Sequence, residues 1–467
     1  MDRIDLLESG FLYLETPETP MHVAGLSLFK FPDRVNRRTY MARLGDGYRS
    51  TTELRKPFAH RVSQGMLGRF GPLYWEKDPD IELDYHVRHS ALPKPGSYRE
   101  LFTLLSQLHS TLLDRSRPLW EAHLIEGLKD RQFAIYTKLH HATVDGIGGI
   151  RLTEGGCSPD PDAIAELSPL SIEAHEKFKA EHGYARVADL DPSESELQAI
   201  VEFFTAQFKT SAHVLGLIKN YAATWLGLGD GLAVPWRHVP HTMINTRISS
   251  ARRFVAQSWS IDRVRAVSKA LGVTINDVVL AMCSGALRRY LEGHDELPEH
   301  SLRALVPVSV RQEDDFDSPV AISYIVADLA TRHEDPIDRL ETIVKSTRAG
   351  KEMLSELTPR EASLYAALVQ TPMFVASLVG VADRFPPVST VISNVPGPRE
   401  QLYLNGAPLL GAYPLSAVFH GFALNITFVS YHDNLDFGIV ACRRTVPHVQ
   451  RLIDYMEQSL AELEEAV

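Results

Sequence analysis

FAIYTKLHHATVDG, residues 133–146, carries more structural information than any other segment of this chain. Its first half is a short, largely apolar run, which predicts a buried strand. The strand leads directly into the adjacent pair His140 and His141, so that an imidazole stands where the sheet ends and can face a cleft. Asp145 follows ahead of the helix-like segment GIGGIRLTE, at the position of a helix N-cap. The segment therefore predicts a strand, a loop with histidine chemistry and a helix.

The two histidines have different expected roles because neighbouring residues of a strand point to opposite faces. If His141 faces the cleft, His140 faces inward, where it packs or donates to the backbone. A neutral imidazole can take a proton from a hydroxyl near neutral pH, since its ordinary pKa is about 6.5. We therefore predict His141 as a general base, His140 as its support, and Asp145 as the residue that fixes the loop through a hydrogen bond or an arginine pair. The simpler alternative is a solvated loop in which Asp145 only caps the helix.

Metal binding is a weaker interpretation of the same histidines. Adjacent histidines on a strand would not chelate one ion together, and no further His/Cys cluster stands nearby, so we predict no metal site. Cys157, Cys283 and Cys442 are widely spaced, without a CxxC pair. This spacing favours a reducing compartment over a disulfide framework or a zinc cluster. None of the three lies in a recognisable nucleophile context, so covalent catalysis by a cysteine is not indicated.

Composition narrows the class of protein. The chain has 467 residues, more than one ordinary hydrophobic core accommodates, which predicts two domains. Hydrophobic residues make up 44% and charged residues 23%, the balance of a soluble globular protein. No apolar run is long enough to span a bilayer, and the N-terminal stretch lacks the features of a secretory signal. The net charge of −11 disfavours nucleic acid as a partner, although a few local arginines can still hold a small anion.

Strand and helix patterns alternate through both halves of the chain, which predicts an α+β protein. We expect an N-terminal half over residues 1–185, a helical connector over 186–240, where the composition changes, and a C-terminal half over 241–467. Strands are expected at residues 22–31, 120–126, 133–139, 254–261, 302–310, 320–329, 388–392, 423–431 and 435–441. Helices are expected at residues 100–113, 262–272, 275–293, 336–353 and 446–465.

HHxxxDG after an apolar strand is similar to the signature of the bacterial wax ester synthase/diacylglycerol acyltransferase family. That family belongs to the larger set of proteins with a chloramphenicol-acetyltransferase-like fold, which includes peptide-synthetase condensation domains. Further blocks resemble the family's signatures in the expected order: PMHV (20–23), LDYHVRH (83–89), PLW (118–120), TINDVVL (274–280), PVSVR (307–311), SNVPGP (393–398) and LDFG (435–438). Two places depart from the pattern: Gly148 stands where the family usually has a small hydroxyl residue, and residues 317–323 lack a Gly-Asn pair.

The resemblance implies a two-layer α+β sandwich made of two chloramphenicol-acetyltransferase-like halves. Each half would have a mixed β-sheet flanked by helices, with an active-site tunnel between the halves. It also implies an acyl-CoA-dependent O-acyltransferase that transfers a fatty acyl group to a long-chain alcohol, giving a wax ester, or to diacylglycerol, giving triacylglycerol. His141 would remove the hydroxyl proton for direct attack on the thioester. Acyl-CoA is a substrate in this scheme, and no cofactor is expected.

Further site residues follow from the resemblance. Asn276 is either a polar group near the developing oxyanion or, with Asp277, an ordinary helix cap. Arg311 either neighbours the phosphate or pantetheine of CoA or anchors Asp145. The residues expected to bind substrate are Gly146, Arg311, Ser393 and Asn394, and the last two alternatively only shape the crossover between the halves. Trp120 is expected to be a core residue, because a large aromatic side chain is mostly buried.

Two other classes of function fit parts of the pattern. Condensation-type transfer to an amine or to a carrier-bound substrate is disfavoured by the absence of a carrier-protein domain from this sequence. A catalytically inactive lipid-binding protein is disfavoured by the intact HHxxxDG. The apolar-rich segment 200–228 is either an interfacial helix that docks on membranes or lipid droplets, or a helix packed between domains. We expect a cytoplasmic protein that associates peripherally with the cytoplasmic face of the membrane or with lipid droplets.

Overall fold

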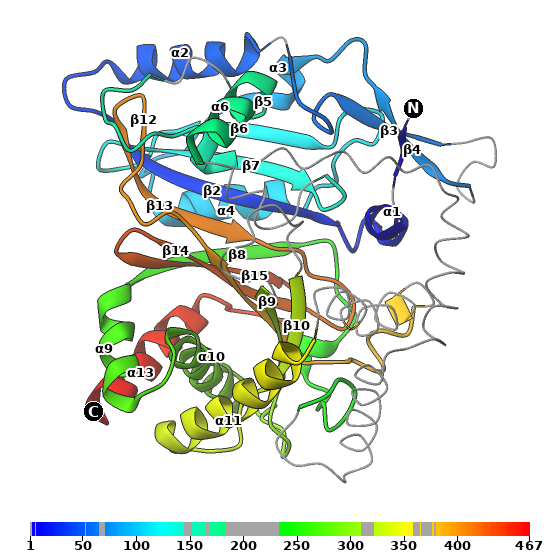
Figure 1. Ribbon diagram of the computed structural model, residues 1–467, viewed down its shortest axis with the longest axis vertical. Coiled ribbons are helices and arrows are strands. Elements are labelled where there is room, and N and C mark those ends of the chain that lie inside the picture. The colour runs from blue at the N-terminus through cyan, green and yellow to red at the C-terminus, as the bar shows by residue number, and fades with distance from the viewer. Residues whose placement is uncertain are drawn as a thin grey trace. The chain divides into compact units, whose positions relative to one another are not determined.

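The computed structural model describes most of the chain (Figure 1): residues 2–4, 6–51, 53–64, 71–143, 152–164, 168–182, 233–309, 322–357, 365, 376–377 and 380–467. The chain forms two compact units, each assembled from separate stretches. The first comprises Met1–His182, Thr246–Arg265 and Ser393–Ile453, and the second comprises Gly183–Asn245, Ala266–Ile392 and Asp454–Val467. The expected division of the chain at residues 185 and 240 stays a prediction, and most of the expected connector lies outside the described residues.

The first unit contains a six-stranded mixed sheet whose strands come from distant parts of the sequence. In spatial order the strands are β12 (Tyr403–Leu404), β13 (Ala407–Leu415), β2 (His22–Lys30), β7 (Gln132–His140), β6 (Trp120–Glu126) and β5 (Val87–Ala91). Neighbouring strands are antiparallel except β5 and β6, which are parallel. β7 is an inner strand with buried Phe133, Ala134 and Ile135. The apolar run that predicted this strand therefore lies inside the sheet.

Helices and a small three-stranded sheet complete the N-terminal part of this unit. The elements are α1 (Leu6–Leu14), α2 (Arg37–Arg49), α3 (Leu83–His86), α4 (Tyr98–His109), α6 (Ile172–His182), β1 (Asp2–Arg3), β3 (His60–Gln64) and β4 (Leu73–Lys77). α4 begins with a capping box between Ser97 and Glu100. At its other end, the ammonium of Lys138 on β7 donates to the carbonyls of Leu108 and Thr111, at 3.1 and 3.0 Å. This helix is therefore fixed at both ends, and one of the fixing groups comes from the sheet.

Three further strands of the first unit are β8 (Arg252–Ser260), β15 (Asn434–Cys442) and β14 (Leu424–Tyr431), which pair antiparallel in that order. Phe254, Phe428 and Phe437 are buried among them. Gly438 on β15 allows a close approach of β13, because a Cβ at this position would lie 1.8 Å from the carbonyl oxygen of Pro414. Only glycine fits between these two backbones.

The second unit contains β9 (Arg303–Ser309), which pairs antiparallel with β10 (Ile322–Asp328) and parallel with the start of β11 (Thr390–Pro396). Its helices are α10 (Ile275–Glu292), α11 (Pro336–Ser355) and the short η2 (Met243–Asn245), together with parts of α9 (Ile261–Leu271) and α13 (Arg451–Glu465). Thr274 and Asp277 form a capping box at the start of α10. Asp335 caps α11, whose first residue is Pro336, the residue type favoured at that position.

The predicted α+β class with mixed sheets and flanking helices is confirmed. Trp120 is confirmed as a core residue: it is 1% exposed, and its indole N–H donates to the carbonyl of Phe58. The prediction missed several described strands, among them β3, β4, β5 and β13; β5 is polar, and β13 contains glycine and proline. Among the described helices, no single one has the length and apolar composition to cross a membrane; α9 and α10 meet that test only as a pair bent by 104°. The expected tunnel between the halves stays a prediction.

Candidate active site

β7 carries the first histidine of the pair into the interior of the first unit. His140 is its last residue, lies opposite His22 of β2, and is 0% exposed. Its backbone N–H donates to the carbonyl of Leu119 at 3.0 Å. The side chain is held on the inner side of a central strand, the environment that the alternation of strand residues predicts for one of two adjacent histidines.

A tight turn follows the strand and is closed by hydrogen bonds of its own residues. The backbone N–H and the hydroxyl of Thr143 both donate to the carbonyl of His140, at 2.8 and 2.7 Å. The backbone N–H of Ala142 donates to Nδ1 of the His140 ring at 3.1 Å. Since Nδ1 accepts a hydrogen bond, the proton of the neutral ring lies on Nε2. The turn therefore selects the tautomer of His140.

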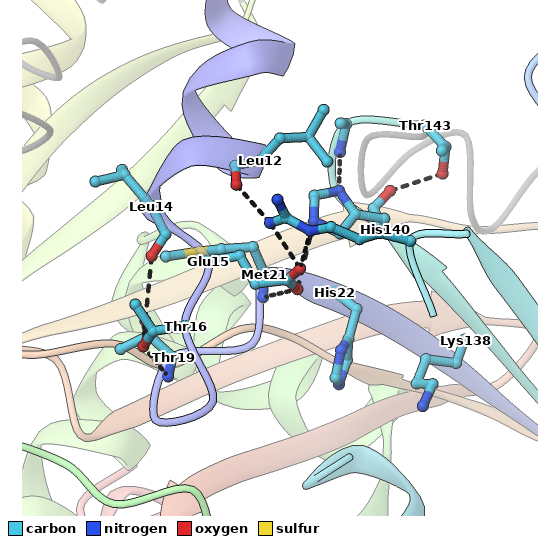
Figure 2. Close-up of polar contacts among 12 residues, drawn as sticks. Leu12, Leu14, Glu15, Thr16, Thr19, Met21, His22, Lys138, His140 and Thr143 are labelled. Carbon is cyan, nitrogen blue, oxygen red and sulfur yellow. Dashed lines mark hydrogen bonds and ion pairs between the residues drawn. The ribbon is translucent and has the colours of Figure 1, made fainter. Parts of the chain in front are cut away.

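A buried carboxylate lies beside this ring. Figure 2 shows the side chain of Glu15 next to His140 and Met21. Oε1 of Glu15 accepts from the backbone N–H of Met21 at 3.1 Å and lies 3.4 Å from Nε2 of His140, an ion-pair distance that is long for a hydrogen bond. Oε2 accepts from both Nε and Nη2 of Arg115, at 3.1 and 3.0 Å. The Glu15 side chain is only 2% exposed, and it joins the histidine turn to the guanidinium of Arg115, whose side chain is 41% exposed.

The electrostatics of Glu15 favour its charged form. Burial by itself raises the pKa of this carboxyl group, but the contact with His140, the N–H of Met21 and the charge of Arg115 outweigh burial and lower the pKa below its ordinary value. Glu15 is therefore a carboxylate at neutral pH. The sequence prediction missed both Glu15 and Arg115, since a lone acid after a short helix and a lone arginine 100 residues later resemble surface residues.

His141, the first residue of the turn, has a different environment from His140. Its backbone N–H donates to the carbonyl of Met21 at 2.9 Å. Its side chain is half-buried, and the ring lies nearly parallel to that of Phe11 in α1, with 4.2 Å between centroids and 16° between planes. One histidine of the pair is thus enclosed by the fold, and the other keeps partial access to solvent.

Further buried polar side chains line the face of the sheet on which His140 lies. Nε2 of His22 contacts the carbonyl of His109 at 2.9 Å, and Nδ1 of His109 lies 3.0 Å from the hydroxyl of Tyr136. Lys138, which is 0% exposed, pairs with Glu121 at 3.2 Å. Apart from Nδ1 of His22, which has no hydrogen-bond partner among the described residues, these polar atoms have partners inside the protein, which is the usual condition for burying polar side chains.

The protonation of this cluster follows from burial and charge. Burial lowers the pKa of His22 well below its ordinary value and, with the nearby charges of Lys138 and Arg252, lowers that of His109 to about 3. Both imidazoles are therefore uncharged and weakly basic at neutral pH. Burial alone would raise the pKa of Glu121, but contacts with His123, Lys138 and Arg88 lower it to about 2.

The other predicted site residues lie in different places. Asn276 is half-buried in the first turn of α10, in the second unit. Asp277 next to it is a helix cap, as one of the two interpretations held, and also accepts from the hydroxyl of Thr347 at 2.8 Å. Ser393 is half-buried and Asn394 is exposed on β11. The remaining three predicted residues, Asp145, Gly146 and Arg311, lie outside the described residues.

Within the described ranges, no three His, Cys, Asp or Glu side chains come together as a group that could hold a metal ion. Of the three free cysteines, Cys283 and Cys442 are buried and Cys157 is half-buried. The polar side chains described around the histidine turn carry imidazole, carboxylate and guanidinium groups.

Two family models match the chain. The wax ester synthase/diacylglycerol acyltransferase catalytic domain matches residues 4–279, and the C-terminal domain of the same family matches residues 321–464. A probable diacylglycerol O-acyltransferase of Mycobacterium tuberculosis is 42% identical over 479 aligned positions that cover 100% of both chains. The O-acyltransferase WSD of Acinetobacter baylyi is 39% identical and covers 96% of this chain and 94% of its own.

Solved structures of other proteins are also similar to this chain. The wax ester synthase/diacylglycerol acyltransferase from Marinobacter aquaeolei is 37% identical, with a TM-score of 0.76 over 99% of each chain. The first condensation domain of the calcium-dependent antibiotic synthetase is 16% identical, with a TM-score of 0.57 over 99% of this chain and 95% of its own. At that identity the second match bears on the fold alone.

Proposed function

The chain belongs to the wax ester synthase/diacylglycerol acyltransferase family, and from that premise we propose that it transfers a fatty acyl group from acyl-CoA to the hydroxyl of a long-chain alcohol or of diacylglycerol. The products would be a wax ester or a triacylglycerol, with free CoA. Acyl-CoA is a substrate in this reaction, and the proposal assigns no cofactor.

The proposed mechanism is a direct attack assisted by His141. The imidazole takes the proton of the acceptor hydroxyl while the oxygen adds to the thioester carbonyl. The tetrahedral intermediate then collapses, its C–S bond breaks, and the CoA thiolate leaves with the electron pair of that bond. The proton returns from His141 to the thiolate or to solvent. No covalent acyl-enzyme is involved.

The observation that carries the assignment of His141 is the contrast within the histidine pair. His140 is 0% exposed and lies next to the buried carboxylate of Glu15, whereas the ring of His141 is half-buried. A base must reach the hydroxyl that it deprotonates, and only the second ring has solvent access. His22 and His109 are buried, and their lowered pKa values make them poor bases.

We further propose that Asp145 shapes the loop, that Asn276 stabilises the oxyanion, and that Gly146, Arg311, Ser393 and Asn394 contact substrate. For Asn276, the half-buried position at the start of α10 supports a role in which the amide faces solvent or substrate. An oxyanion donor is worth about 3–4 kcal/mol in comparable acyl-transfer sites. Asn276→Ala would therefore lower kcat by about 10²-fold or more, whereas loss of a helix-cap neighbour would change stability instead.

The activity assay mixes the purified protein with palmitoyl-CoA and either hexadecanol or dipalmitoylglycerol. Thiol release and ester formation are followed together, so that hydrolysis of the thioester is distinguished from transfer. The proposal predicts ester formed in step with CoA released, and the preferred acceptor separates wax ester from triacylglycerol synthesis. Thiol release no higher than in the blank with every acceptor would refute it and leave a lipid-binding role.

We also propose that the protein is cytoplasmic and associates peripherally with the membrane or with lipid droplets. The support is chemical: both proposed acceptors are apolar and partition into lipid. The apolar-rich segment 200–228, the candidate interfacial helix, lies outside the described residues. Flotation with liposomes tests the proposal directly, since a bound protein rises with the vesicles. Protein that stays at the bottom of the gradient at both low and moderate salt would contradict it.

A further inference from the structure

The ring of Phe11 covers one face of the His141 imidazole. The two planes are 16° from parallel and their centroids are 4.2 Å apart, which is direct stacking contact. Phe11 lies in α1 and is half-buried, as is His141. Neither the sequence signatures nor the proposed mechanism gives this phenylalanine a role.

The position of Phe11 is fixed by the packing of its neighbours in α1. Leu12 is 1% exposed and belongs to an apolar cluster that includes Trp75, Leu119 and Ala142, the residue after His141. The hydroxyl of Tyr13 donates to the carbonyl of Gly71 at 2.5 Å. The helix is therefore held at the two residues that follow Phe11, and one of them belongs to the same apolar cluster as a residue of the histidine turn.

Helical spacing places Phe11 and Glu15 together. The backbone N–H of Glu15 donates to the carbonyl of Phe11 at 3.1 Å, which continues the helical hydrogen-bond pattern beyond Leu14. Residues four apart lie on the same face of a helix. The result is that one face contacts both histidines, with the carboxylate of Glu15 beside His140 and the ring of Phe11 on His141.

We propose that Phe11 is a positioning residue for His141, which orients the imidazole by stacking and stabilises the imidazolium that forms when the base takes the acceptor's proton. The inference rests on the proposed function of His141. The face of an aromatic ring carries partial negative charge and attracts a cation within about 6 Å of its centroid. The 4.2 Å separation lies well inside this range. The stabilisation is larger for the charged ring than for the neutral one, so it acts mainly in the transition state.

The alternative is that Phe11 only packs against His141. This alternative predicts a different result for a leucine substitution. Leucine is apolar and of similar bulk, so Phe11→Leu keeps His141 covered while removing the aromatic face. Alanine would instead admit water to the imidazole, and hydration favours the charged form. Phe11→Leu is therefore the informative substitution, and Phe11→Tyr is the conservative one that restores an aromatic face.

The experiment is the pH profile of kcat/KM for wild type, Phe11→Leu and Phe11→Tyr, with Phe102→Leu as a matched control. Phe102 is a half-buried helical phenylalanine that packs on Tyr98 and Phe254 in the first unit. For Phe11→Leu we expect the plateau to fall roughly two- to fivefold and the inflection of the base to move about half a pH unit lower, since a stabilised imidazolium has the higher pKa. Phe11→Tyr and Phe102→Leu should keep the wild-type plateau of kcat/KM and the wild-type inflection.

A second measurement reports on the stack without turnover. Histidine ring signals are observed by NMR, and the signal missing from His141→Ala identifies His141. Stacking predicts an upfield position for this signal, which Phe11→Leu loses and Phe11→Tyr keeps. Phe11→Met replaces the leucine variant if that protein does not fold.

Failures of the two proposals are distinguishable. If His141→Ala is inactive but Phe11→Leu keeps the wild-type plateau and inflection, His141 remains the base and the role of Phe11 is refuted. Equal losses of kcat/KM in Phe11→Leu and Phe102→Leu, without a shift of the inflection, would also refute the role of Phe11. Such losses would show only that less protein is folded. If His141→Ala keeps wild-type activity, the assignment of the base itself fails.

Discussion

Replacing Glu15 with glutamine removes one negative charge from beside the histidine turn while keeping the side chain nearly the same shape. The amide oxygen can still accept the N–H of Met21, but its NH2 group then faces the guanidinium of Arg115, which offers only donors. The carboxylate beside Nε2 of His140 is lost in the same step. The substitution therefore tests the charge of Glu15 separately from its packing.

The magnitude follows from the contacts. Hydrogen bonds to a charged group contribute about 1.5–3 kcal/mol, but the Arg115 side chain is 41% exposed and can turn to water when its partner is lost. We expect Glu15→Gln to lower the free energy of unfolding by roughly 1–2 kcal/mol. Glu15→Ala, which also leaves the N–H of Met21 without its acceptor, should cost about 3–5 kcal/mol. Misplacement of the turn by a fraction of an ångström should lower kcat by roughly tenfold for glutamine and up to about 10²-fold for alanine.

The assay combines urea unfolding with the rate of CoA release from palmitoyl-CoA. Glu18→Gln is the matched control, since Glu18 lies on the same segment, is 49% exposed, and pairs with Arg247 and His420 at 3.5 and 3.4 Å. We expect this exposed pair to contribute less than about 1 kcal/mol and nothing to kcat. A Glu15→Gln protein with wild-type kcat and stability would show that the buried carboxylate does not control the turn.

The pH dependence of this difference has a definite sign. The pKa of Glu15 is lowered in the folded protein, so its charge stabilises the fold fully above the ordinary carboxyl value of 4.5. That contribution is lost as the pH falls below this value. The stability difference between wild type and Glu15→Gln should therefore shrink on acidification, and a difference that stays constant down to pH 3 would contradict the assigned ionisation.

Three further predictions concern the framework that holds the site. Lys138→Met should lower the free energy of unfolding by about 3–5 kcal/mol in urea titrations, because it removes the buried ammonium that pairs with Glu121 and donates to two carbonyls at the end of α4. Glu121 has its pKa lowered to about 2, so about 3 kcal/mol of stability should be lost between pH 4.5 and pH 2, and Glu121→Gln should flatten that part of the profile. Gly438→Ala should reduce stability by about 3 kcal/mol or more, measured as a lower thermal midpoint, because its Cβ would lie 1.8 Å from a backbone oxygen of Pro414.

The sequence predicted those parts of the fold whose signal is local. The strand before His140 was found because it is largely apolar, and the burial of His140 next to a half-buried His141 agrees with the alternation of strand residues. The start of α10 was predicted because Asn276 and Asp277 stand at the beginning of an apolar helical run, and the structure shows a capping box between Thr274 and Asp277 there. Such features can be predicted without knowing which strands become neighbours.

The contacts that the prediction missed depend on chain segments far apart in sequence. Glu15 and Arg115 lie 100 residues apart, so no local pattern in the sequence indicates that they pair. Phe11 resembles any apolar residue of an amphipathic helix until α1 is placed beside the end of β7. β13 was missed for another reason, since its glycine and prolines resemble a loop until pairing with β2 shows a strand.

The role of His141 as the base is the central claim, and the rate of CoA release by His141→Ala with palmitoyl-CoA and hexadecanol tests it most directly. A general base of this kind contributes about 10²–10⁴-fold, so the variant should lose at least about 10²-fold in kcat while still binding palmitoyl-CoA. The control is His89→Ala on β5, whose histidine is partly exposed, pairs with Glu126 at 3.4 Å, and should leave the rate unchanged. Wild-type turnover by His141→Ala would contradict the account.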